Sequence, residues 1–160
     1  MKRNKVLKML EAAQDYANQY SGCKKVAVGS AICMGDKDSF IIYGANTTLP
    51  ENCRECGCQR EELYGENSKE HRLPSDCRAV HSEIDAICIA ARFGVAIRGA
   101  SIVITRYPCE ACARAIVRAG ISKVYYGRQQ EISEQTKRIF EKGNVCVTWV
   151  KEWEYDDTEN

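Results

Sequence analysis

Two short fragments of the sequence combine residue types that bind metal ions and move protons. One reads His-Ser-Glu at residues 81–83, and the other reads Pro-Cys-Glu-Ala-Cys at residues 108–112. A Cys-x-x-Cys pair on the first turn of a helix places both sulfur atoms on one side, near the positive end of the helix dipole. That position favours the thiolate, which is the form of cysteine that binds a metal.

These fragments predict a zinc site with the ligands His81, Cys109 and Cys112. Three protein ligands leave the fourth tetrahedral position for water, as catalytic zinc sites require. The metal lowers the pKa of that water toward neutrality. Glu83 lies only two residues beyond His81, which makes it an awkward further ligand to the same ion. We therefore predict that Glu83 is the catalytic group that exchanges protons with the water and the substrate.

A Cys-x-x-Cys pair by itself also occurs in thioredoxin-like redox motifs and in structural zinc ribbons. The separate His-x-Glu fragment discriminates among these classes. A structural zinc site has no use for a carboxylate beside an open coordination position. His-x-Glu followed by Pro-Cys-x-x-Cys is the signature of zinc deaminases. A structural zinc-binding module is the non-enzymatic alternative, and Glu83 is the residue that separates the two hypotheses.

The spacing of apolar residues predicts the elements that must position these groups. The first segment is typical of an amphipathic helix ending near Gly22, with an apolar face of Val6, Leu10, Ala13, Ala17 and Tyr20. Further helices are expected at about 84–94, 109–119 and 131–141, and strands at 26–33, 40–43, 101–105, 124–126 and 145–150. The order α-β-β-α-β-α-β-α-β predicts an α/β fold with a central sheet between layers of helices.

Length and composition indicate one ordinary globular domain. The 160 residues are 28% charged and 44% apolar, with a net charge of +1. We expect a deaminase domain at residues 1–150, with a cysteine-rich insertion at about 46–77, and an acidic tail at 151–160. The near-neutral charge argues against a long nucleic acid as partner, whereas a small anion needs only a local basic pocket. Because no stretch is typical of a signal peptide or a membrane helix, we expect no membrane partner and a cytoplasmic location.

Ten cysteines are many for such a chain. Because nothing in the sequence directs export to an oxidising compartment, metal binding is favoured over a disulfide framework. Three of the cysteines lie in apolar runs and are interpreted as small buried hydrophobic residues: Cys33, Cys88 and Cys146.

Two stretches resemble the cytidine/deoxycytidylate deaminase superfamily. They read Cys-Arg-Ala-Val-His-Ser-Glu-Ile-Asp-Ala-Ile at residues 77–87 and Pro-Cys-Glu-Ala-Cys-Ala-Arg-Ala-Ile-Val-Arg-Ala-Gly-Ile at 108–121. The similarity extends from Cys23 to about Val150 and is greatest to the zinc-dependent dCMP deaminases. The resemblance implies a three-layer α/β/α cytidine deaminase-like fold with a central five-stranded mixed sheet. It also implies a homo-oligomer, because relatives assemble as dimers up to hexamers.

The resemblance further implies hydrolytic deamination of a pyrimidine nucleotide. The activated water would attack C4 of cytosine, and Glu83 would protonate N3 and help ammonia leave, so that dCMP becomes dUMP. The backbone N–H near Ser82 would hold the pyrimidine carbonyl, and Asn46 would contact the sugar, although an Asn at this place is also a common turn residue. Alternative substrates are cytidine, guanine or adenosine in tRNA. The Gly-Tyr-Asn-Gly segment usual in dCMP deaminases here reads Tyr-Gly-Ala-Asn-Thr at residues 43–47, a departure that bears on substrate identity.

Some relatives carry a second, structural zinc that ties the insertion to the end of the first helix. The resemblance assigns four cysteines to it: Cys23, Cys53, Cys58 and Cys77. A closed four-cysteine site is of the structural type and would supply folding free energy to a long loop. Cys56 and His71 compete for places in this site, and the alternative is a set of free thiols. Other residues with a substrate role to test are Arg60, Arg78 and Arg106 for a phosphate and Tyr107 for the pyrimidine.

Overall fold

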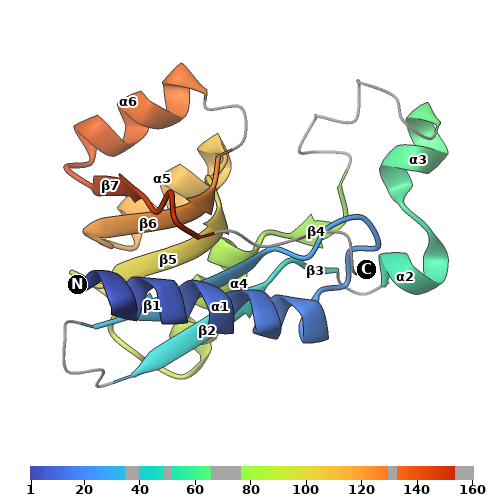
Figure 1. Cartoon of the computed structure of the whole chain (residues 1–160). Helices are drawn as coiled ribbons and strands as arrows, with labels where there is room; N and C mark the ends of the chain where they lie inside the picture. The colour runs from blue at the N-terminus through green and yellow to red at the C-terminus, as the bar shows by residue number, and fades with distance from the viewer. Residues whose placement is uncertain (35–39, 49–51, 66–76, 130–132, 154–160) are drawn as a thin grey trace.

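A computed structural model describes residues 1–34, 40–48, 52–65, 77–129 and 133–153. Five strands form the central sheet in the order β2-β1-β5-β6-β7 (Figure 1). β1 is antiparallel to both β2 and β5, whereas β5, β6 and β7 are parallel to one another. The predicted mixed five-stranded sheet is therefore confirmed. Its strands are β1 (Gly29–Cys33), β2 (Ile41–Ala45), β5 (Ser101–Arg106), β6 (Lys123–Arg128) and β7 (Cys146–Trp149).

Helices cover both faces of this sheet. The long first helix, α1 (Arg3–Tyr20), lies across one face, where it packs on β1, β2 and β5 (Figure 1). Side by side on the other face lie α4 (Ser82–Arg92), α5 (Glu110–Arg118) and α6 (Glu134–Lys142). This arrangement confirms the three-layer α/β/α fold.

Alternation along the strands divides the core into two layers. Neighbouring residues of a strand point to opposite faces of the sheet. On the α1 side the buried strand residues are Ala31, Cys33 and Val103. On the side of α4, α5 and α6 they are Ile32, Ile102 and Ile104. The sheet is thus apolar on both faces, as expected for a sheet covered by helices on both sides.

The burial of α4 differs in part from the prediction. Cys88, interpreted from the sequence as a small buried residue, is exposed, and the buried apolar residues are Ala86 and Ala90, with Ile87 half-buried against the core. Small residues are favoured here because α4 passes very close to β2. A Cβ atom added to Gly44 would lie 2.6 Å from the backbone nitrogen of Ala86.

Two further exposure predictions were also wrong. Tyr20 is 52% exposed, since it is the last residue of α1 and extends beyond the sheet. Cys146 is exposed because it lies on β7, the edge strand of the sheet.

The insertion contains more structure than expected. β3 (Thr47–Thr48) pairs antiparallel with β4 (Ala79–Val80), and two short helices, α2 (Cys53–Cys56) and α3 (Gln59–Tyr64), follow β3. The ion pairs of Glu61 with Lys24 and Lys25 connect α3 to the segment after α1. His71, one of the competing metal ligands, lies outside the described residues.

The chain after β7 returns to the body of the protein. Trp153 is only 6% exposed, and its ring lies against Gly127. Residues 154–160, which carry most of the predicted acidic tail, lie outside the described part. None of the described helices combines the length and the apolar character needed to cross a membrane.

Candidate active site

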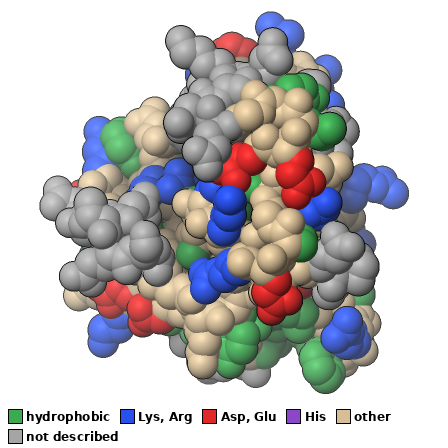
Figure 2. Space-filling model, turned by 90° about the vertical axis from the view of Figure 1, so that its right-hand side faces the viewer, with side chains coloured by type: hydrophobic (Ala, Val, Ile, Leu, Met, Phe, Trp, Pro, Cys, Tyr) green, Lys and Arg blue, Asp and Glu red, His purple; other side chains and the backbone are tan. Residues whose placement is uncertain are grey.

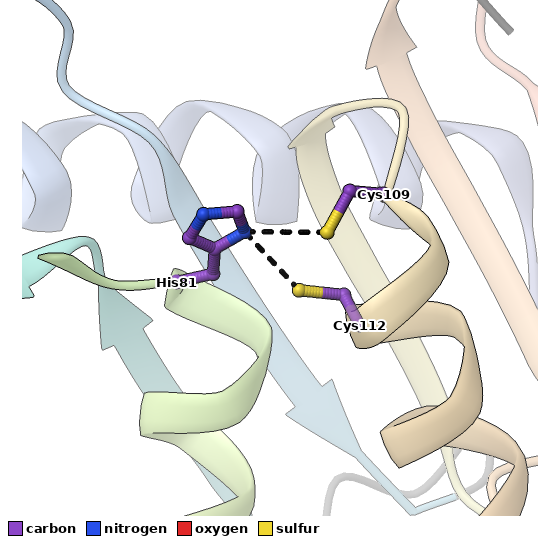
Figure 3. Close-up of side chains that lie close together, drawn as sticks. All are labelled: His81, Cys109 and Cys112. Carbon is purple, nitrogen blue, oxygen red and sulfur yellow. Dashed lines mark hydrogen bonds between the residues drawn. The ribbon is translucent and has the colours of Figure 1, made fainter. Parts of the chain in front are cut away.

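The three predicted metal ligands come together at the beginnings of two helices. His81 immediately precedes α4, Cys109 immediately precedes α5, and Cys112 lies in the first turn of α5. His81 Nδ1 is 3.5 Å from Cys109 Sγ and 3.3 Å from Cys112 Sγ (Figure 3). The ligand atoms all lie within 4.8 Å of one another, and this is the only such group among the described residues.

The spacing of these atoms fits a tetrahedral zinc ion. Zinc–sulfur bonds of about 2.3 Å and zinc–nitrogen bonds of about 2.0–2.1 Å, at tetrahedral angles, separate a nitrogen and a sulfur ligand by about 3.6 Å. The two measured nitrogen–sulfur distances, 3.5 and 3.3 Å, are close to this value. The donor set of one imidazole and two thiols also matches catalytic zinc. Zinc can therefore be held by these residues with little rearrangement.

The electrostatics of the site favour a metal-binding thiolate. The pKa of Cys109 is lowered to about 3, first because the Cys112 thiol donates a hydrogen bond to its sulfur and also because His81 lies beside it. The pKa of His81 is raised, mainly by its hydrogen bond with Cys109. Both cysteines sit at the positive end of the α5 dipole, which stabilises negative charge on sulfur.

Glu83 is buried beside the metal ligands. It is the second residue of α4, its side chain is 4% exposed, and its Oε2 accepts a hydrogen bond of 3.1 Å from Ser82 Oγ. Burial raises the pKa of the Glu83 carboxyl above its ordinary value. A carboxyl with a raised pKa can both accept and donate a proton near neutral pH. The residue therefore has the position and the chemistry of a proton shuttle.

Three hydrogen bonds connect α4 to the strands β1 and β2, and β5 to the beginning of β1. Ser30 Oγ donates to the Ser82 carbonyl at 2.8 Å, and the backbone N–H of Ala45 donates to the Asp85 carboxylate at 3.1 Å. On β5, Thr105 Oγ1 accepts from the N–H of Gly29 at 3.0 Å. The positioning role of these side chains was not predicted from the sequence. The only signal was a polar residue in an otherwise apolar strand, at Ser30 and at Thr105.

A cavity of about 270 Å³ opens in front of the metal ligands. His81, Glu83 and Cys109 line this cavity together with Asn46 and Tyr107. This face of the molecule is hollowed at its centre, with Lys and Arg side chains gathered around the hollow and Asp and Glu side chains nearby (Figure 2). The cavity is close in size to the smaller pockets that hold metabolites.

Asn46 has a structural role in addition to its place in the cavity. Its Oδ1 accepts hydrogen bonds from Ser21 Oγ at 2.7 Å and from the backbone N–H of Val28 at 2.8 Å. Its Nδ2 donates to the carbonyl of Val26 at 2.8 Å. These bonds hold the segment between α1 and β1 in place. The amide nitrogen has a second N–H, which leaves one donor for a ligand.

The four cysteines predicted for a second metal lie near one another but are less closely grouped. Burial raises the pKa of the Cys53 thiol, and the nearby Cys23, Cys58, Cys56 and Cys77 raise it further. However, no three of their sulfur atoms in the described structure lie within 4.8 Å of one another. None of the ten cysteines forms a disulfide. Cys23, Cys58 and Cys77 also line the cavity in front of His81.

Several known proteins similar to this chain are named deaminases. The model of the cytidine and deoxycytidylate deaminase zinc-binding region matches residues 3–128. ComE operon protein 2 of Bacillus subtilis (strain 168) is 29% identical over 132 residues, which cover 82% of this chain. The deoxycytidylate deaminase of Enterobacteria phage T4 is 43% identical over 96 residues, or 60% of this chain. The matched regions span 64% and 44% of the lengths of these two relatives.

A solved structure shares the fold. The dCMP deaminase from the cyanophage S-TIM5, in complex with dCMP and dUMP, has a TM-score of 0.69, with 22% identity. The superposition covers 93% of this chain and 98% of that one. The family match over residues 3–128 includes β4, α4, β5 and α5, the elements that carry His81, Glu83, Cys109 and Cys112. Residues 3–128 match the zinc-binding region of the cytidine and deoxycytidylate deaminases, and the chain belongs to this family.

Proposed function

We propose that the protein catalyses the hydrolytic deamination of a cytosine nucleotide, with dCMP as the substrate and dUMP and ammonia as the products. The observation that carries this proposal is the buried Glu83 carboxyl beside a His-Cys-Cys ligand set at the wall of a cavity. A structural zinc-binding module would need neither the cavity nor the carboxyl, and zinc deaminases need both.

Each residue of the site has a chemical role in this proposal. His81, Cys109 and Cys112 would hold zinc, which when bound supplies an activated water at its fourth position. Glu83 would take one proton from that water and hand it to ring N3, and would then take the second proton from the hydroxyl added at C4 and pass it to the departing amino group. The backbone N–H of Ser82 would bind the pyrimidine carbonyl. The second N–H of Asn46 Nδ2 would reach the sugar from the cavity wall.

The comparisons favour dCMP over other cytosine compounds. The phage T4 relative is named a deoxycytidylate deaminase, and the cyanophage neighbour binds dCMP and dUMP. The cationic rim of the cavity suits a phosphorylated substrate better than cytidine or guanine. A net charge of +1 disfavours tRNA as the substrate.

The test compares the zinc-loaded protein with Glu83→Gln. Ammonia release is measured with dCMP, CMP, deoxycytidine, cytidine, guanine and a tRNA, and zinc content is measured alongside. We expect dCMP to be the best substrate. Glu83→Gln should keep its zinc and its fold and lose about 10³-fold or more in kcat. Glu141→Gln, a change of an exposed acid on α6, is the control. Undiminished turnover by Glu83→Gln would overturn the catalytic role.

We also propose that Cys23, Cys53, Cys58 and Cys77 bind a second, structural zinc. Supporting this, the other three lie near Cys53 and raise its pKa, and all four are free of disulfides. Binding would draw the sulfur atoms to about 3.8 Å from one another, the separation set by tetrahedral bonds of about 2.3 Å.

Zinc content tests this second site. The purified protein is expected to hold two zinc ions per chain, and Cys58→Ser one. Cys88→Ser, at an exposed cysteine on α4, is the matched control. If Cys56→Ser loses a zinc ion and Cys58→Ser does not, Cys56 is the ligand instead. His71→Ala tests the other competing ligand in the same way. One zinc ion in the unmodified protein would exclude the site.

Three broader proposals accompany this function. The protein would act in the cytoplasm, which suits ten cysteines without a disulfide. It would be a single deaminase domain at residues 1–150 that carries the insertion at about 46–77. It would assemble as a homo-oligomer, as the family resemblance implies, and sedimentation at micromolar concentration measures this directly.

A further inference from the structure

A second hollow, with a strongly cationic lining, adjoins the active-site cavity. This hollow has a volume of about 140 Å³, and four residues line both spaces: Cys23, Lys25, Val26 and Arg106. Its basic lining residues are Lys24, Lys25, Arg54 and Arg106. The two hollows therefore share a wall, with the metal ligands lining the first and four basic side chains lining the second.

An acidic residue offsets part of this charge. Glu61 forms ion pairs with Lys24 and Lys25, the latter with Nζ 3.1 Å from Oε1. The lining of the hollow itself contains four basic side chains and no acidic one. Burial lowers the pKa of Arg106, which shows that its guanidinium is partly removed from water. A partly dehydrated guanidinium gains more from an anion than an exposed one does.

Arg106 lines the same cavity as Glu83 and Cys109. Arg106 is the last residue of β5, and the metal ligand Cys109 follows it by three residues, so their Cα atoms are at most about 11 Å apart. A base held at Cys109 and Glu83 would thus have its phosphate within reach of the β5 end.

The other two arginines considered from the sequence fit less well. Arg78 Nη1 contacts Cys56 Sγ at 3.3 Å, and Arg78 is not part of the cavity wall. Arg60 lines the cavity, but its charge acts on His81, so it lies at the end where the base would bind.

We propose that Arg106 and Lys25 form the binding site for the 5′-phosphate of the substrate, with the guanidinium as the principal contact. This inference rests on the proposed function, because it extends the same cavity from the base to the phosphate. It makes Arg106 a residue that determines specificity for nucleotides over nucleosides.

The test separates binding from turnover. Binding of dCMP and of inorganic phosphate is measured by calorimetry on zinc-loaded Glu83→Gln, which cannot consume the substrate. Adding Arg106→Gln is expected to weaken dCMP binding about 10- to 100-fold, the effect of losing a charged hydrogen-bonding pair. It should leave deoxycytidine binding unchanged. Adding Lys25→Gln should weaken dCMP binding less but in the same selective way; because this change also removes the ion pair with Glu61, the Tm of the variant is measured alongside.

Kinetics give an independent readout in the otherwise unmodified enzyme. Arg106→Gln should raise KM for dCMP by the same factor with kcat changed less than about threefold, and it should weaken competitive inhibition by inorganic phosphate. Arg138→Gln, at an exposed arginine of α6, is the matched control.

The opposite results overturn the inference. Equal losses for dCMP and deoxycytidine would mean that Arg106 acts only structurally, and unchanged dCMP binding in both variants would exclude the subsite. If the unmodified enzyme releases no ammonia from dCMP yet binds it through Arg106, the proposed function fails while the phosphate site stands.

Discussion

Gly44 lies where α4 crosses β2, and we predict that Gly44→Ala damages both stability and the active site. A Cβ atom at this position would lie 2.3 Å from the carbonyl oxygen of Ser82, 2.6 Å from the nitrogen of Ala86 and 2.9 Å from the Cβ of Ala86. Two of these neighbours are backbone atoms, so rotation of a side chain cannot relieve the overlap. The start of α4, between His81 and Ala86, must move instead.

The required movement sets the expected magnitude. Ordinary contacts between heavy atoms begin near 3.5 Å, so the helix must shift by about 1 Å. Overpacking of this kind costs about 3 kcal/mol, the upper end of the usual range. In a domain of this size such a loss lowers Tm by about 6–12 °C. A displacement of about 1 Å at His81 and Glu83 would lower kcat/KM about 100-fold.

Chemical unfolding, zinc content and ammonia release measure these effects together. Gly94→Ala is the matched control, because nothing lies within 4 Å of its Cβ position and its cost is the strain of a φ of +64°. That strain costs about 1–2 kcal/mol and should leave activity intact. If Gly44→Ala is no less stable than Gly94→Ala and equally active, the close approach of α4 to β2 does not position the site.

Three further changes test other parts of the fold. Thr105→Val should lower the free energy of unfolding by about 1–3 kcal/mol, because it leaves the buried N–H of Gly29 without an acceptor; Thr105→Ser keeps the acceptor and should cost less, and equal losses would contradict this. Burial raises the pKa of Asp85 above that of the unfolded chain, so its contribution to stability is present at low pH and lost as pH rises through the folded-state pKa. Asp85→Asn keeps an acceptor for Ala45, so it should gain stability relative to the unmodified protein at about pH 7 but not at about pH 4, and a pH-independent difference in urea unfolding would refute this. Trp153→Ala should destabilise by about 3 kcal/mol and Trp149→Ala by clearly less, since Trp153 is 6% exposed and Trp149 39%; similar Tm values for the two variants would show that the segment after β7 does not stabilise the body.

The grouping of His81, Cys109 and Cys112 could be predicted from the sequence because it depends largely on local spacing. Cys109 and Cys112 share one helical turn, and His81 is followed at once by Glu83. The strands of the sheet were also predictable, since β1 and β5 are short, mostly apolar runs typical of buried strands. The agreement between the predicted and observed positions of these side chains and strands shows how strongly short sequence patterns restrict local structure.

Other features depend on contacts between distant parts of the chain. The periodicity of α4 favours Ile87 for the core, and Ile87 packs against it as a half-buried residue, but Gly44 brings the helix so close to β2 that the fully buried apolar positions of α4 are the alanines Ala86 and Ala90. Tyr20 belongs to an apolar stripe that continues past the edge of the sheet. The link between the cavity and Arg106 arises from the end of β5, which no local pattern indicates.

The pairing of β3 with β4 closes the insertion at its base. The chain leaves the body after Thr48 and returns at Ala79, directly opposite, two residues before His81. Residues of the insertion, Cys58 and Arg60 among them, line one side of the cavity, whereas the metal ligands belong to the sheet and its helices. A change in the length or sequence of the insertion would therefore alter its part of the cavity wall, and with it the choice of substrate. The candidate metal ligands would keep their positions, because they belong to the sheet and its helices.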